Sequence, residues 1–150
     1  MALDVGQSRV GIASLDARRG IRDESVLRRV SLADDLRRLA HLARERNARL
    51  VLIGVPLNAD GSAGPQARLT RRFARALDDV LRESGIAVET WDETDTSVEA
   101  TAELGLVGRP LDDRERAAVD SHAAAILLRR YLSAVARSSS AMPSEASGQE

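Results

Sequence analysis

The order of apolar and polar residues along the chain predicts an α/β domain that begins with strands. Apolar and β-branched residues near the N-terminus flank a glycine-containing turn, which indicates a β-hairpin. Farther along, apolar residues recur at helical spacing or form short runs bounded by proline or glycine. The predicted elements are a hairpin at 2–13, a polar connection at 16–24, a strand at 25–30, a helix at 32–46, a strand at 50–55, a helix at 66–84, a strand at 86–91, a short helix at 96–105 and a long helix at 114–136.

The run at 50–55 contains only apolar residues and glycine and ends at Pro56. This pattern is typical of a strand covered on both faces, as in a parallel α/β sheet. The order βββαβαβαα therefore predicts a single α/β domain with a mixed central sheet flanked by helices. We expect this domain to span residues 1–136. Residues 137–150, rich in Ser, Ala, Pro and Glu, are expected to form a disordered tail.

The helices have recognisable starts and apolar faces. Ser31 is a predicted N-cap, and Thr96 with Glu99 forms a capping-box pattern. The residues expected to be buried are Leu32, Leu36, Leu39, Ala40 and Ala43 in the first helix, and Leu69, Phe73, Ala76, Leu77, Val80 and Leu81 in the second.

Composition restricts the class of protein. The chain of 150 residues has no cysteine, which excludes disulfides and thiolate metal sites. No apolar run approaches the ~20 residues needed to cross a bilayer, and no signal peptide opens the chain. We therefore expect a cytoplasmic protein with no membrane partner. The formal net charge of -1 argues neither for nor against nucleic acid.

Asp4 ends the first apolar strand directly before a glycine turn. An unpaired buried carboxylate is costly, so a cation or hydrogen-bond donors should lie nearby. Asp4, Gly6 and Gly11 together form the pattern D-x-G-x-x-x-x-G. Because the two glycines lack a Cβ, a phosphate or metal can come close to the backbone there. That pattern is compatible with metal-dependent phosphodiester chemistry, with binding of a nucleotide phosphate, or with an aspartate that merely finishes a strand.

Two more carboxylates interrupt apolar elements. Glu93 follows the last predicted strand, at the edge where α/β sheets usually place their chemistry. Asp120 lies on a helix face with Ala123 and Ala124, whereas an ion pair with Arg116 would belong on a solvated face. Three carboxylates brought together repel, and divalent cations with oxygen ligands relieve that repulsion. The acids therefore predict a site for Mg²⁺ or Mn²⁺, which can support phosphodiester hydrolysis.

Four sequence blocks contain or adjoin these acids. They are Leu3–Gly6 with Arg9–Ala13, Ile53–Asn58 with Asp60–Ser62 and Gly64–Ala67, Trp91–Glu93 with Thr96, and Val119–Ser121 with Ala123–Ala124 and Ile126–Leu127. Over about residues 1–133 the sequence resembles the YqgF (RuvX) family, relatives of the Holliday-junction resolvase RuvC in the ribonuclease H-like superfamily. The resemblance implies a ribonuclease H-like fold and a metal-dependent nuclease. Its catalytic and metal-binding acids are then Asp4, Glu93 and Asp120.

The chain departs from the family pattern in three places. Relatives usually carry Arg and then an apolar residue after the Asp-Glu pair, whereas this chain has Thr94 and Asp95. This change removes a phosphate contact and adds a negative charge beside the site. The loop before the last helix, usually basic, is mixed at 112–116, and the first strand begins almost at Met1.

A basic stripe marks the second predicted helix, where arginines recur at i, i+3, i+4 and i+7. A solvated helix face would show the same pattern. Because the stripe follows the loop at 56–66, we expect phosphate-backbone contacts, which give affinity without sequence preference. The predicted nucleic-acid contacts are Arg9, Asn58, Ser62, Gln66, Arg68, Arg71, Arg72 and Arg75.

The resemblance favours a nuclease that processes the 5′ end of the 16S ribosomal RNA precursor. Resolution of branched DNA is the alternative reaction, because both substrates present phosphates to the same acids. Paired cleavage of a four-way junction needs two active sites, so a homodimer favours DNA and a monomer favours RNA. Two other classes of protein stay open. One is a protein that binds nucleic acid without cutting it. The other is a nucleotide-binding protein: actin-like ATPases and sugar kinases close two similar lobes over ATP, and this chain would supply one such lobe.

Overall fold

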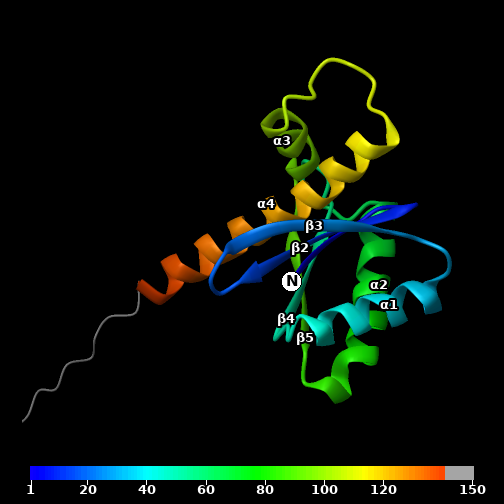
Figure 1. The fold of residues 1–150 in the computed structure, drawn as a ribbon, viewed down its shortest axis with the longest axis vertical. Coiled ribbons are helices and arrows are strands. Elements are labelled where there is room, and N and C mark those ends of the chain that lie inside the picture. Colours follow the sequence, from blue (N-terminus) through cyan, green and yellow to red (C-terminus); the bar gives the residue numbers. More distant parts are fainter. Residues whose placement is uncertain (141–150) are drawn as a thin grey trace, which may run out of the picture.

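The computed structural model describes residues 1–140, which form a five-stranded sheet with helices on both faces (Figure 1). The spatial order of the strands is β3-β2-β1-β4-β5. Neighbours among β1, β2 and β3 run antiparallel, whereas β4 is parallel to both β1 and β5. The predicted mixed α/β fold is therefore confirmed. Strand bounds are β1 Ala2–Val5, β2 Arg9–Asp16, β3 Gly20–Arg28, β4 Leu50–Val55 and β5 Ala87–Asp92.

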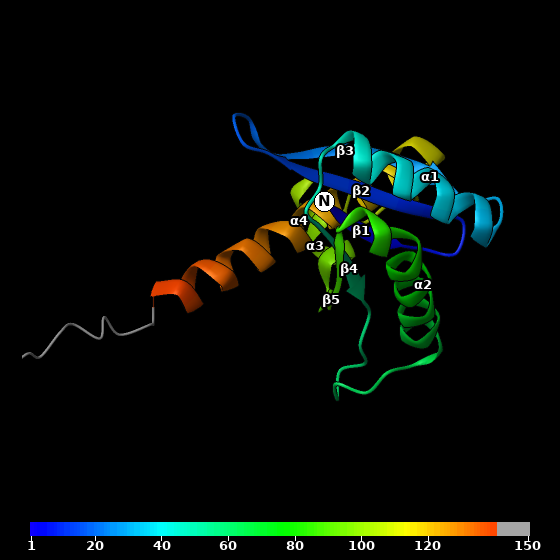
Figure 2. The same cartoon turned by 90° about the horizontal axis from the view of Figure 1, so that it is seen from below.

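The helices divide between the two faces of the sheet, as Figure 1 and Figure 2 show. The bounds are α1 Leu32–Glu45, α2 Pro65–Leu81, the 3₁₀ turn η1 Arg82–Ser84, α3 Thr96–Glu103 and α4 Asp113–Ser140. Helices α1 and α2 cover one face, where Leu3 and Val5 of β1 join the larger apolar core. Side chains alternate along a strand. Ala2 accordingly packs with α4 on the other face, and Asp4 points to that face as well.

The third strand begins earlier than predicted. A tight turn at 17–19 leads from β2 directly into β3, so the expected polar connection at 16–24 is wrong. The carboxylate of Asp16 accepts the backbone N–H groups of Arg18 and Arg19 at 2.8 and 2.9 Å, and Gly20 has a φ of 79°. Because β3 is an edge strand with a solvated face, its polar residues remain compatible with a strand.

The helix starts were predicted with mixed success. Ser31 is the N-cap of α1, as predicted, and its hydroxyl accepts the N–H of Asp34 at 3.2 Å. The capping box at Thr96 is wrong: Asp95, at a φ of 63°, precedes the helix without a side-chain cap. Thr96 is the first helical residue, and its hydroxyl donates to the Glu93 carbonyl at 3.1 Å.

Three residues predicted to be buried are exposed: Leu32, Leu69 and Val80 keep 51%, 56% and 39% of their surface accessible. The buried side of α2 instead includes Thr70 and Ala74. Leu32 and Leu69 lie near the starts of their helices, beside an open groove. The spacing of apolar residues predicts which side of a helix is apolar, but those residues are buried only where another element packs against that side.

Helix α4 continues to Ser140, past its predicted end at Ala136, so residues 137–140 of the predicted tail are helical. Its last turns extend beyond the sheet (Figure 2). The rest of that tail, 141–150, lies outside the described residues. Within 1–140, no helix combines the length and apolar character needed to span a membrane.

Candidate active site

Two of the predicted acids meet across a strand. Asp4 lies on β1 and Glu93 directly follows β5, with β4 between them. Their carboxyl groups are hydrogen-bonded to each other. The contact depends on Gly54 of β4, because a Cβ there would lie 2.0 Å from Oε2 of Glu93. Gly54 therefore leaves the space through which the Glu93 side chain reaches Asp4.

A second glycine brings the third acid near. Gly11 of β2 is the register partner of Asp4, and a Cβ at Gly11 would lie 2.0 Å from the carbonyl oxygen of Asp120 on α4. Helix α4 thus passes close over β2 beside Asp4, and the charge of Asp120 acts on that carboxyl. The missing Cβ of Gly11 makes room for the backbone of α4, whereas the sequence pattern predicts room for a phosphate or metal.

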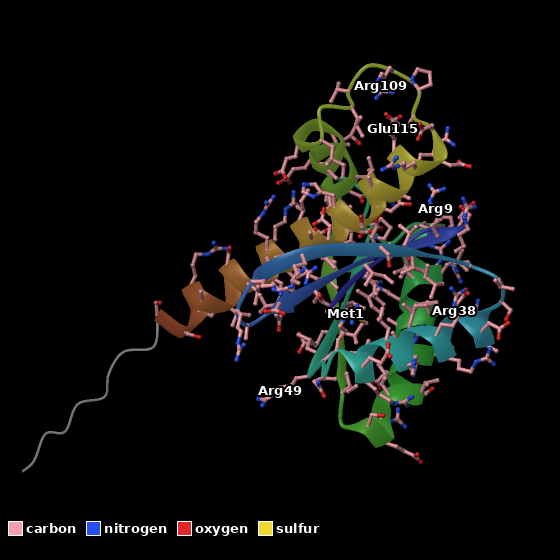
Figure 3. The ribbon with its side chains drawn as sticks, in the orientation of Figure 1. Met1, Arg9, Arg38, Arg49, Arg109 and Glu115 are labelled. Carbon is pink, nitrogen blue, oxygen red and sulfur yellow. The ribbon has the colours of Figure 1, made fainter. Side chains whose placement is uncertain are left out.

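Arg9 holds the carboxylate of Asp120. Its Nε donates to Oδ2 at 2.7 Å, and both side chains are largely shielded from solvent. Figure 3 labels Arg9 near the turn that joins β1 to β2. Arg116, the alternative partner considered for Asp120, pairs with Asp113 at 3.3 Å. Arg9, predicted to contact nucleic acid, is therefore the ion-pair partner of Asp120 in this structure and offsets its charge.

The electrostatics of the pair follow from its burial. Burial raises the pKa of Asp4 to about 6, with a further increase from the charge of Asp120 and an opposing effect of the hydrogen bond with Glu93. Burial also raises the pKa of Glu93 to about 9, assisted by the charge of Asp4 and by their hydrogen bond. Without a cation, the pair therefore retains one proton at neutral pH.

The residues fit a divalent cation. Oε2 of Glu93 is buried, and no N–H or hydroxyl group of the described residues donates to it, which is unusual for a carboxyl oxygen. Carboxylate oxygens are the ligands that Mg²⁺ and Mn²⁺ prefer. No group of three acidic or histidine side chains within residues 1–140 is already arranged around a common metal position. Asp4 and Glu93 are in contact, whereas the carboxylate of Asp120 is turned to Arg9.

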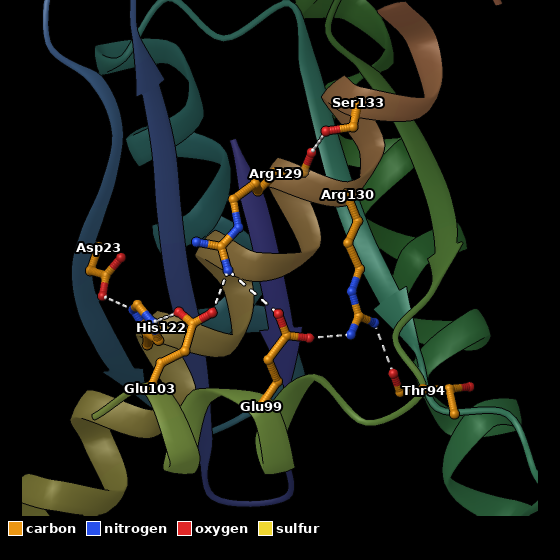
Figure 4. A network of polar contacts seen from close by, with 8 residues as sticks. All are labelled: Asp23, Thr94, Glu99, Glu103, His122, Arg129, Arg130 and Ser133. Carbon is orange, nitrogen blue, oxygen red and sulfur yellow. Dashed lines mark hydrogen bonds and ion pairs between the residues drawn. The ribbon is translucent and has the colours of Figure 1, made fainter. Parts of the chain in front are cut away.

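A polar network supports the segment that follows Glu93 (Figure 4). Arg130 of α4 donates to the carbonyl oxygen of Thr94 at 2.8 Å and also binds Glu99 of α3. The Thr94 hydroxyl donates to Asp92 at 2.5 Å. The Thr94 side chain is therefore turned toward Asp92, and Arg130 holds its backbone.

The same network continues to the edge strand β3. The ring of His122 on α4 contacts Asp23 at 2.6 Å and Glu103 of α3 at 2.7 Å, and Arg129 binds Glu103 at 2.8 Å (Figure 4). Burial of the ring lowers the pKa of His122, but the hydrogen bonds to both acids outweigh it, so the pKa is raised overall. These contacts fix α3 against α4, and no local sequence pattern predicts them, because their partners lie far apart in the chain.

The other predicted nucleic-acid contacts surround the start of α2. The amide of Asn58 donates to Ser62 at 2.9 Å, and Arg68 donates to the carbonyl of Ala63 at 2.8 Å, so these groups shape the loop. The Gln66 amide donates to the carbonyl of Val5 at 3.4 Å and ties α2 to the strand that carries Asp4. Within the described part of the chain, three exposed arginines of the stripe form no side-chain hydrogen bond: Arg71, Arg72 and Arg75.

The loop between α3 and α4 offers little free positive charge. Arg109 binds Glu115, whose carboxylate also accepts the N–H of Asp112 at 3.0 Å (Figure 3). Of the charged residues at 112–116, Arg116 thus pairs with Asp113 inside the segment, and Glu115 pairs with Arg109 just before it.

Known proteins resemble the chain in sequence and in fold. Residues 1–134 match the RuvX family, described as Holliday junction resolvase. A Synechococcus protein (strain ATCC 27144) is 38% identical over 135 residues, covering 88% of this chain and 87% of its own. A Myxococcus xanthus protein is 39% identical over 136 residues, covering 89% of this chain and 87% of its own. Both are named "Putative pre-16S rRNA nuclease".

The fold also resembles that of Thermus thermophilus RuvC. Its structure aligns with a TM-score of 0.53 at 12% identity, over 89% of this chain and 94% of RuvC. The structure of that protein in complex with a Holliday junction substrate aligns with a TM-score of 0.54 at 12% identity, over 88% of this chain and 92% of that chain. At this identity the likeness shows the fold alone. From the sequence match over residues 1–134, the chain belongs to the RuvX (YqgF) family.

Proposed function

We propose that this protein is a metal-dependent nuclease that hydrolyses phosphodiester bonds in structured nucleic acid. The observation that carries the proposal is the buried contact between Asp4 and Glu93, where Oε2 of Glu93 has no donor. The charge of Asp120 lies close enough to raise the pKa of Asp4. Family membership and the names of the relatives support the same activity.

The acids have distinct roles in this proposal. Asp4, Glu93 and Asp120 would hold Mg²⁺ or Mn²⁺, which when bound activates water and stabilises a leaving oxygen. Arg9 keeps the Asp120 carboxylate beside the site and neutralises part of its charge. Glu93 retains a proton near neutral pH until a cation replaces it, because its pKa is about 9.

The precursor of 16S rRNA is the substrate we favour. Relatives that share 38% and 39% of their residues with this chain carry that substrate in their names. A four-way DNA junction is the second candidate, favoured by the description of the family and by the fold shared with RuvC. Both substrates would meet the exposed arginines of α2 through their phosphates.

Cleavage assays with a precursor rRNA fragment and a four-way DNA junction, each with and without Mn²⁺, test the proposal. We expect the parent to cut the RNA only with metal, and Asp4→Asn to abolish cutting while the protein stays folded. Asp79→Asn, on an exposed part of α2, is the matched control and should cut like the parent. Full activity of Asp4→Asn would contradict the site, and binding without cleavage in any metal would indicate a non-catalytic protein.

A further inference from the structure

A groove of about 700 Å³ opens on the α1–α2 side of the sheet, at the same end as the acids. Its walls include Val5 and Gln7, on either side of Gly6 in the segment that follows Asp4. Val5 and Asp4 point to opposite faces of β1, so the turn at 6–8 separates the groove from the acids. A nucleic-acid strand that crosses this turn passes from the acids to the groove.

Three large apolar side chains are exposed in the groove. Val30, Leu32 and Leu69 line it and leave 76%, 51% and 56% of their surface accessible. Single exposed apolar residues are common, but several around one concavity indicate a binding surface. These three come from different elements, the β3–α1 connection, the start of α1 and the N-terminal part of α2, so the surface is formed by the fold.

Polar groups accompany the apolar walls. The groove is lined by Gln7 and Gln66, whose amides offer donors and acceptors, and by Thr70, whose buried Oγ1 has no partner. Arg29 donates to the carbonyl oxygen of Gly6 and to Asp35, each at 2.9 Å, and stacks 5.3 Å above Phe73.

The charge at the groove is positive. The ion pair with Arg29 neutralises Asp35, the acid in the lining. Arg72, also in the lining, is exposed and forms no side-chain hydrogen bond within the described residues. A cation at the rim is therefore available for a phosphate.

We infer that this groove binds an unpaired nucleobase of the substrate strand where that strand crosses the turn at 6–8. The exposed aliphatic side chains suit the apolar face of a base, the glutamine amides suit its edge, and Arg72 suits the adjoining phosphate. The volume lies in the range of small-molecule sites, whereas a stable protein partner needs a broader surface. The inference rests on the proposed nuclease function, and it adds that the substrate has a single-stranded segment beside the cleaved bond.

Binding of fluorescein-labelled RNA hairpins with a single-stranded flank, measured by anisotropy in EDTA, tests this inference. In one set of hairpins, each flank base in turn is replaced by an abasic nucleotide. For the parent, we expect one position at which the loss of the base weakens binding by about 10-fold, the size of one base contact. Leu69→Ser should weaken binding of the intact RNA by a similar factor. For this variant, replacing the critical base by an abasic nucleotide should then cause no further loss of binding.

Val80→Ser is the matched control, because Val80 is an exposed apolar residue on the same helix outside the groove. It should bind every hairpin like the parent. If the parent binds and cleaves RNA but no abasic position matters, or if Leu69→Ser retains full sensitivity, the inference is wrong and the nuclease proposal stands. If Leu69→Ser changes only the oligomeric state, the groove is a protein interface. If the parent neither binds nor cuts RNA, both proposals fail.

Discussion

Replacing Glu93 by glutamine removes a titratable group from the buried pair and keeps its size. The pKa of Glu93 is raised from 4.5 to about 9, so folding of the metal-free protein takes up a proton between these pH values. The contribution of this group to stability is fully present below pH 4.5 and is lost as the pH rises toward 9. The free energy of unfolding should fall by about 1.4 kcal/mol per pH unit in this window.

The most informative range runs from about pH 6.5 to about pH 8.5, because Asp4, with a pKa of about 6, is largely ionised there. Over this range the free energy of unfolding of the parent should fall by on the order of 2–3 kcal/mol, and that of Glu93→Gln should not show this decrease. Urea denaturation in EDTA at several pH values measures the difference. Comparing the two proteins cancels other titrating groups, including His122, whose raised pKa produces a loss of the same sign.

Glu83→Gln, at an exposed position of η1, is the control and should follow the parent. Saturating Mg²⁺ should flatten the pH dependence of the parent, since a cation stabilises both ionised acids, and should affect Glu93→Gln less. If the stabilities of parent and Glu93→Gln fall in parallel with pH, Glu93 does not carry the proton. If Mg²⁺ leaves the slope of the parent unchanged, the acids are not its ligands.

Two glycines and two arginines supply further tests. Gly54→Ala should lower cleavage at least about 10-fold with a small loss of stability, because the atoms nearest its Cβ belong to the Glu93 side chain. Gly11→Ala should lower the thermal midpoint more, since its Cβ would meet the backbone of α4 at 2.0 Å; equal losses of stability would contradict this contrast. Exchanging Arg71 and Arg72 for glutamate should weaken nucleic-acid binding and reduce its salt slope by about one for each lost phosphate contact. An unchanged slope would identify the stripe as a solvated face.

The strands of the central sheet could be predicted because their signals are local. The apolar run Leu50–Val55 becomes β4, parallel to both neighbours and buried on both faces. The start of β3 could not be predicted, because Arg22 and Asp23 are polar residues of an edge strand. Burial on the helices was harder still. Leu69 fits the apolar stripe of α2 but borders a groove, whereas the polar Thr70 is buried.

The three acids could be proposed one by one, because each interrupts an apolar element. Their contacts could not be predicted, because those contacts depend on residues far apart in the sequence. Arg9 reaches Asp120 across 111 positions, and no local pattern links them. Gly54, which lets Glu93 cross β4, stands within an ordinary apolar strand and gave no signal of its role.

Small residues on the α4 side of the sheet are part of how the site is formed. Ala13 of β2 packs against Ala124 and Ala125, and Gly11 faces the backbone of α4 at Asp120. Larger side chains there would hold the helix farther from the sheet and withdraw Asp120 from Asp4. Small residues bury less apolar surface, so this face gains less from the hydrophobic effect than the face covered by α1 and α2. The short alanine-rich run on α4 thus buries less apolar surface, but it allows the helix to lie close enough to the sheet to place Asp120 near Asp4.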